Sequence, residues 1–155
     1  MFYNNLAGEK VSALGLGAMR FPMVNGKVLE DKTQEIINYA YLNGVNYFDT
    51  GYKYLNGESE VILGKCLNAY PRNTWYLATK MPGHMMVKYD KNRLRFRGYM
   101  RNDKPESVKE IFENQLKKCN VEYFDFYLLH NDSKYLTECK IKIEEKLKDV
   151  GLILN

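Results

Sequence analysis

Short apolar runs alternate along the chain with longer segments in which apolar residues recur every three or four positions. The runs predict buried β-strands, and the longer segments predict amphipathic helices. We predict strands over residues 11–17, 45–50, 74–80 and 124–130, with a fifth strand beginning at 152–154. A helix is predicted after each of the first four strands. This order is typical of a parallel sheet with crossover helices.

Polar residues mark the expected helix ends. Asp31, with Gln34 three residues later as a capping-box partner, is predicted to cap the first helix. Ser59 and Asp103 are predicted to cap the second and third helices in the same way. Gly44 is expected to end the first helix in a left-handed conformation, because glycine adopts it without strain.

Residues 81–102 break the alternation and are predicted to form a long loop. Eight basic and two acidic residues lie between Lys80 and Lys104. A loop of this length in a compact domain is a lid, a binding loop or a mobile insertion. We interpret it as a solvated face, with binding of an anionic ligand as the alternative. Its aromatic residues form no regular stacking ladder, so the sequence does not favour nucleic acid as a partner.

The composition narrows the class of protein. The 155 residues fit a single domain over 1–155, and the formal charge of +4 is too small to indicate nucleic-acid binding. Three cysteines without paired spacing indicate a reduced, cytoplasmic setting and no metal site. No apolar run approaches the roughly 20 residues that a membrane span needs. The first residues have neither the basic start nor the apolar stretch of a signal peptide.

Ionisable residues stand at the ends of three predicted strands. Asp49, Lys80 and His130 end the second, third and fourth strands, and Tyr54 lies in the loop after the second. In a parallel barrel the carboxyl ends of all strands face the same way, so these four side chains can converge. Taken singly, each of these residues is explained by an ordinary structural role. Tyr52 is the alternative to Tyr54 as the proton-donating tyrosine, and the spacing favours Tyr54.

Such a set suits reduction of a carbonyl group. A free tyrosine is a poor acid at neutral pH, but a neighbouring lysine ammonium stabilises the phenolate. An aspartate keeps the lysine charged and oriented, and a histidine can position the carbonyl oxygen. No side chain supplies a hydride, so a cofactor has to provide it.

Several motifs agree in order and spacing with one known family. From about Val11 to Gly151 the chain resembles the N-terminal half of an aldo-keto reductase. The matching features are Leu14-Gly15-Leu16-Gly17, Gly44-Val45-Asn46-Tyr47-Phe48-Asp49-Thr50, Tyr54, Ser59-Glu60 with Leu63-Gly64, Thr79-Lys80-Met81-Pro82, and Tyr127-Leu128-Leu129-His130.

The resemblance implies a (β/α)8 barrel that uses NADPH or NADH to reduce aldehydes or ketones. It implies that Tyr54 is the general acid, that Lys80 and Asp49 tune it, and that His130 orients the carbonyl. It also implies that the nicotinamide lies near a loop that contains Gly17, Ala18 and Met19, with Asp49 beside it. The expected partner is a small carbonyl substrate.

The length of the chain leaves a second interpretation open. A (β/α)8 barrel needs about 250 residues, and this sequence supplies about four βα units and the stub of a fifth strand. The alternative to an active reductase is therefore a truncated, non-catalytic remnant of the family. Half a barrel leaves strand edges and an apolar interior uncovered, which predicts self-association into a homo-oligomer.

Overall fold

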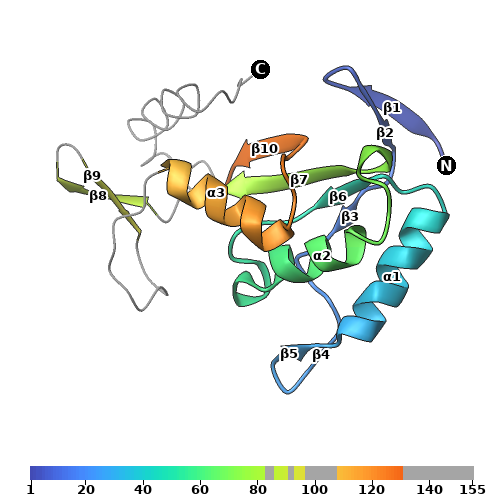
Figure 1. Ribbon diagram of the computed structural model, residues 1–155, viewed down its shortest axis with the longest axis horizontal. Helices are drawn as coiled ribbons and strands as arrows, with labels where there is room; N and C mark the ends of the chain where they lie inside the picture. The colour runs from blue at the N-terminus through green and yellow to red at the C-terminus, as the bar shows by residue number, and fades with distance from the viewer. Residues whose placement is uncertain (83–85, 91–92, 97–107, 131–155) are drawn as a thin grey trace. The chain divides into compact units, whose positions relative to one another are not determined.

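A four-stranded sheet with parallel pairs is the main sheet of the described residues (Figure 1). The structure, a computed structural model, describes residues 1–82, 86–90, 93–96 and 108–130. The main sheet has the strand order β10-β7-β6-β3. Its strands are β3 (Leu16–Gly17), β6 (Tyr47–Asp49), β7 (Tyr76–Met81) and β10 (Phe126–Leu129). The pairs β3–β6 and β6–β7 are parallel. The predicted α/β class with a parallel sheet is confirmed.

The chain divides into two units. The first unit comprises Met1–Lys80 and Leu116–Leu128, and the second contains the described residues within Met81–Gln115 and Leu129–Asn155. Helices follow the strands as expected. They are α1 (Glu30–Leu42), α2 (Ser59–Leu67) and α3 (Val108–Cys119), with short 3-10 turns η1 (Tyr54–Gly57) and η2 (Arg72–Thr74).

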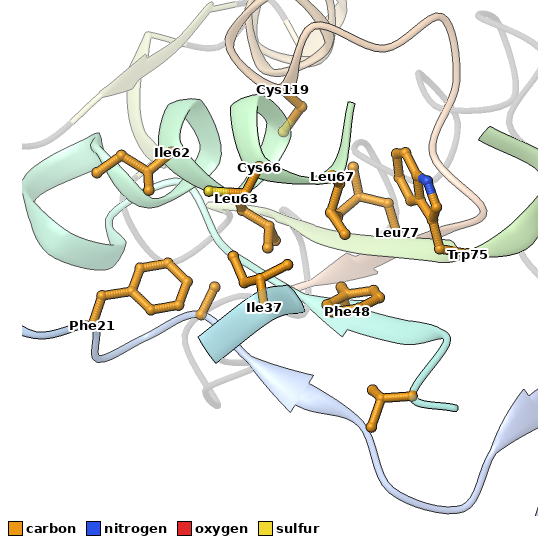
Figure 2. Packing of buried hydrophobic residues seen from close by; sticks show 12 residues of the cluster. Phe21, Ile37, Phe48, Ile62, Leu63, Cys66, Leu67, Trp75, Leu77 and Cys119 are labelled. Atoms are coloured by element: carbon orange, nitrogen blue, oxygen red, sulfur yellow. The ribbon is translucent and has the colours of Figure 1, made fainter. Parts of the chain in front are cut away.

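The first unit is built around one apolar layer. Figure 2 shows Ile37 of α1 and Leu63 and Leu67 of α2 pointing toward Phe48 and Leu77 of the sheet. All five side chains are fully buried. Because successive strand residues point to opposite faces, Asp49 and Lys80 leave the sheet on the side away from this layer. The packing therefore orients the predicted site residues.

Gly64 has a packing role in α2. A Cβ atom at this position would overlap the backbone carbonyl of Cys119, at the end of α3. The glycine thus allows the two helices to approach backbone to backbone, which explains a residue that is unfavourable in a helix interior. Cys66 and Cys119 are free, buried thiols.

Several local predictions are wrong. The predicted strand over 11–17 is split, because Val11 and Ser12 belong to a hairpin of β1 (Tyr3–Leu6) and β2 (Glu9–Ser12). Ala7 and Gly8, between its strands, both have positive φ. A second hairpin is formed by β4 (Met23–Val24) and β5 (Lys27–Val28). Its turn residues Asn25 and Gly26 both have positive φ, which suits an Asn-Gly hairpin turn.

The expected capping residues also differ from the structure. Leu29 stands at the N-cap of α1 without a side-chain hydrogen bond, and Asp31 lies inside the first turn. The amide of Gln34 instead donates to Asn38 at 2.6 Å. Glu58, and not Ser59, stands at the N-cap of α2. Gly44 adopts the predicted left-handed conformation, with φ of 88°.

Residues 81–102 are not a plain loop. They contain the antiparallel strands β8 (Met86–Asp90) and β9 (Arg93–Phe96). The predicted cap at Asp103, the helix over 136–150 and the strand at 152–154 lie outside the described residues. Within the described ranges, none of the helices has the length and apolar character to cross a bilayer.

Candidate active site

A lysine with three hydrogen-bond acceptors forms the centre of the candidate site. The Lys80 ammonium donates to both carboxylate oxygens of Asp49, at 2.5 and 2.7 Å, and to the backbone carbonyl of Thr50 at 2.7 Å. Lys80 comes from the end of β7 and Asp49 from the end of β6, and the two strands are paired in parallel. The side chains are 15% and 29% exposed, so the pair is shielded from water only in part.

Tyr54 lies beside this pair. The Lys80 Nζ atom is 4.8 Å from the centroid of the Tyr54 ring. The backbone N–H of Tyr54 donates to the carbonyl of Gly51, which folds the loop back over itself. A Cβ atom on Gly51 would lie 3.1 Å from the ring carbon that bears the hydroxyl. Gly51 therefore leaves the space that the phenol ring occupies.

The loop after Tyr54 has an unusual backbone. Leu55, Asn56 and Gly57 have φ values of 53°, 57° and 91°. Left-handed conformation is costly for leucine, so packing around the loop has to hold it there. Leu55 packs against the apolar core, which supplies such a constraint. This turn places Tyr54 at the strand ends and starts α2 two residues after Gly57.

The predicted cofactor loop lies at the same edge of the sheet. Gly17 pairs in register with Asp49, and the Ala18 N–H donates to the Asp49 carbonyl at 2.7 Å. Ala18 is fully buried, whereas Met19 is exposed. A Cβ atom on Gly17 would meet no atom of the described residues within 4 Å. Open space over Gly17, beside partly exposed Asp49, fits the flat nicotinamide end of a dinucleotide.

His130 belongs to the second unit and follows β10. Its backbone N–H donates to the carbonyl of Met81 at 2.9 Å. The first unit therefore brings together three of the four predicted catalytic residues, Asp49, Tyr54 and Lys80, and the fourth is described within the other unit. Tyr52, the competing tyrosine, is buried, and its ring lies 4.4 Å from the Nζ atom of Lys118.

The surroundings of the site change the pKa of one neighbouring tyrosine, Tyr47. Burial, and to a smaller extent the charge of Asp49, raises the pKa of Tyr47 above its usual value. The cause is that ionising this phenol would place a second negative charge close to Asp49 in a partly dry environment. Tyr47 therefore stays neutral beside Asp49.

Sequence reasoning missed the part played by three residues next to the site. Thr50 supplies a backbone carbonyl to Lys80, and Ser59 and Glu60 make long-range side-chain contacts. The sequence pattern predicts only a local helix cap at Ser59. The burial of Ser59 and Glu60 could have been inferred only from the apolar residues that follow them. Among the described residues, no cluster of His, Cys, Asp and Glu could hold a metal ion.

Parallel strands covered by helices, with a lysine–aspartate pair and a tyrosine at their carboxyl ends, define part of an α/β barrel with a polar site at the usual edge. The aldo/keto reductase family model matches residues 13–155, and the chain belongs to that family.

Relatives agree with this assignment. The chain is 31% identical over 153 residues to "Probable aldo-keto reductase 1" of Glycine max, covering 94% of this chain and 42% of the relative. It is 30% identical over 125 residues to the NADH-specific methylglyoxal reductase of Escherichia coli, covering 77% of this chain and 38% of that protein. The chain thus spans less than half the length of these relatives.

A solved structure extends the likeness to three dimensions. An aldo-keto reductase from Bacillus halodurans, in its holo form, matches with a TM-score of 0.71 and 27% identity. The match covers 99% of this chain and 48% of that one. The fold is therefore that of (β/α)8 aldo-keto reductases over about half their length, as predicted.

Proposed function

We propose that the protein takes part in reducing an aldehyde or ketone with NADPH or NADH, and that Tyr54 is the general acid. The bound cofactor would supply the hydride to the carbonyl carbon. Tyr54 would give its phenolic proton to the carbonyl oxygen, which becomes the alcohol. Lys80 would stabilise the resulting phenolate, and Asp49 would hold Lys80 charged and in place.

The observation that carries this proposal is the environment of Lys80. Its ammonium has two carboxylate oxygens and one carbonyl as acceptors, and it lies within 4.8 Å of the Tyr54 ring centre. An ammonium held in this way is oriented without being withdrawn from the tyrosine. The proposal adds His130 as the group that donates to the carbonyl oxygen, on the strength of its place at the end of a strand.

The cofactor would lie across the open edge of β3 and β6. Gly17 and Met19 are exposed there, Ala18 is held by its bond to the Asp49 carbonyl, and Asp49 is 29% exposed. These residues would contact the nicotinamide end. A structure of an aldo-keto reductase from Klebsiella pneumoniae contains NADPH, and it shares this fold at a TM-score of 0.63 and 23% identity.

Titration of the full chain with NADPH, followed by cofactor consumption with a panel of aldehydes, tests the proposal. We expect binding in the wild type and in Tyr54→Phe, with turnover at least about 100-fold lower in the variant. Tyr52→Phe is the matched control, because it removes the same atom from the neighbouring tyrosine, and its turnover should stay near wild type. Absence of both cofactor binding and turnover would refute the proposal.

A second candidate is a non-catalytic family member that associates with itself. An aromatic cluster lies on the sheet face opposite the buried apolar layer. The ring centroid of Phe126 is 5.4 Å from that of Tyr47 and 6.2 Å from that of Tyr76. Leu128, two residues after Phe126 on the same face of β10, is 43% exposed. An apolar face of this kind favours a partner surface. We propose a second copy of the chain as that partner.

Sedimentation over a wide concentration range tests self-association. A homo-oligomer should dissociate on dilution, and Leu128→Lys should shift the equilibrium toward monomer because it places a charge in the apolar face. A monomer at every concentration would exclude this candidate.

Two free, buried thiols support the expected cytoplasmic setting, since disulfides are rare in reducing compartments.

A further inference from the structure

The first turn of α2 carries two buried polar side chains that the proposed mechanism does not use. The Ser59 hydroxyl lies 2.8 Å from the hydroxyl of Thr50 and donates to the carbonyl of Ala18 at 2.7 Å. Ser59 and Thr50 are both fully buried. One hydroxyl therefore connects the start of α2 to the residues that follow β3 and β6.

Glu60 makes a similar link to β7. One oxygen of its carboxyl group accepts a hydrogen bond from the Thr79 hydroxyl at 2.8 Å, and both side chains are fully buried. The Nζ atom of Lys118 lies 3.9 Å from the other oxygen. Burying a carboxyl group is costly, so this arrangement at a helix start requires an explanation beyond capping.

Both links lead to Lys80. Thr79 precedes Lys80 on β7, and because alternate side chains leave opposite faces, Thr79 points to α2 while Lys80 points to the candidate active site. Thr50 provides the carbonyl that accepts from Lys80 at 2.7 Å. The start of α2 thus contacts the strand from which the lysine extends and the residue that provides its third acceptor.

We propose that Ser59 and Glu60 are positioning residues, which hold the Lys80 ammonium against Asp49 and Thr50 by fixing the ends of β6 and β7. This inference rests on the proposed function only in taking Lys80 as the group to be positioned. The two residues touch no reacting atom. They act from the covered side of the sheet, through Thr50 and Thr79.

Proton–nitrogen NMR of lysine ammonium groups tests the proposal without needing turnover. An ammonium with three acceptors exchanges its hydrogens slowly, so Lys80 should give a resolved signal that Lys80→Met removes and thereby assigns. In Ser59→Ala and Glu60→Ala, exchange of the Lys80 hydrogens with water should rise about tenfold, because one charge-assisted bond loosens. Glu60→Gln keeps an oxygen for Thr79 and should restore slow exchange.

Thr79→Val removes the hydroxyl but keeps the shape of the side chain, so it tests the same link if Glu60→Ala fails to fold. Leu63→Ala is the control for general loosening of α2: it should lower stability and leave the Lys80 signal unchanged. Unchanged Lys80 exchange in Ser59→Ala and Thr79→Val would overturn the proposal. So would an equal change in Leu63→Ala. Absence of cofactor binding would instead refute the proposed function alone.

Discussion

Two ion pairs lie near opposite ends of strand β7, and they differ in what surrounds them. Near the beginning of the strand, Arg72 contacts Asp125 at 2.6 Å. At its end, Lys80 contacts Asp49 at 2.5 Å. The charges and distances are alike. One cation is a guanidinium and the other an ammonium, so the comparison covers both the type of cation and its surroundings.

The pair near the start of β7 makes several further contacts with the protein. Arg72 donates to the carbonyls of Trp75 and Tyr123 as well as to Asp125, and its guanidinium lies 4.3 and 3.9 Å from the rings of those two residues. The same Asp125 oxygen accepts from the N–H of Leu77 at 2.7 Å. Every one of these bonds ties one part of the chain to another, so the pair has a structural role.

The carboxylate at the other end is more open, although the cation there is the less exposed one: Lys80 is 15% exposed against 24% for Arg72. Asp49 is 29% exposed against 13% for Asp125, and a phenol ring stands next to Lys80. Parallel α/β sheets place chemistry at the carboxyl ends of strands and stability at the amino ends. The two ion pairs follow that division within a single strand. Four changes test it, from the largest expected effect to the smallest.

Replacing the cation at the open end should affect chemistry most. Lys80→Met is expected to lower turnover about 1,000-fold, since the phenolate loses its counter-charge. The free energy of unfolding should change by about 1 kcal/mol or less, because water can solvate the remaining Asp49. Steady-state kinetics and urea unfolding measure the two effects. Turnover within tenfold of wild type would contradict the division.

Replacing the cation at the closed end should affect stability instead. Arg72→Met is expected to cost about 3 kcal/mol of unfolding free energy, because Asp125 is left mostly buried without its partner. Arg72→Lys keeps the charge but loses the planar guanidinium, so its free energy of unfolding should lie between those of Arg72→Met and wild type. Urea unfolding measures the loss. A variant as stable as wild type would show that this pair has no structural role.

Alkaline pH should weaken the closed interior of the first unit. Burial, followed by the charge of Glu60, raises the pKa of Cys119 and of Tyr127 above their ordinary values of 9.0 and 10.0. Both groups stay neutral in the folded state while the unfolded chain ionises. Stability is therefore present below about pH 9 and is lost as pH rises above it.

Thermal or urea unfolding across this range measures the slope. Cys119→Ala removes one of the two groups, so the slope should become shallower by about 1 kcal/mol per pH unit between pH 9 and 10. Cys66→Ala is a useful companion, because burial also raises the pKa of that thiol. An unchanged slope in both variants would mean that the thiols titrate alike in the folded and unfolded chain.

A surface ion pair should matter least. Lys65 and Glu30 form an ion pair whose side chains are 68% and 55% exposed. Water screens such a pair, so Lys65→Met should leave the unfolding midpoint unchanged within experimental error. A clear loss of stability there would show that exposure does not separate the ion pairs of this protein.

Much of the candidate site was predictable from short segments of sequence. Asp49, Tyr54 and Lys80 follow apolar runs, and parallel strands bring such positions to one edge. The helix ends were less predictable. Ser59 is predicted to cap a helix because serine before an apolar run commonly does so. In the structure its side chain is buried, and its hydroxyl forms hydrogen bonds with Thr50 and with the carbonyl of Ala18. Asn25-Gly26 is a hairpin signal, because both residues tolerate the positive φ that the turn between β4 and β5 requires.

The sequence alone determined the alternation of strands and helices, the family, and which side chains stand at strand ends, because these depend on periodicity and on neighbours along the chain. Tertiary structure alone decided which acceptors Lys80 uses, and that Glu60 is buried against Thr79. Those contacts join residues 19 to 31 positions apart in the sequence. Such partners meet only when the strands and α2 are packed together. The hydrophobic pattern within a short segment does not specify that packing.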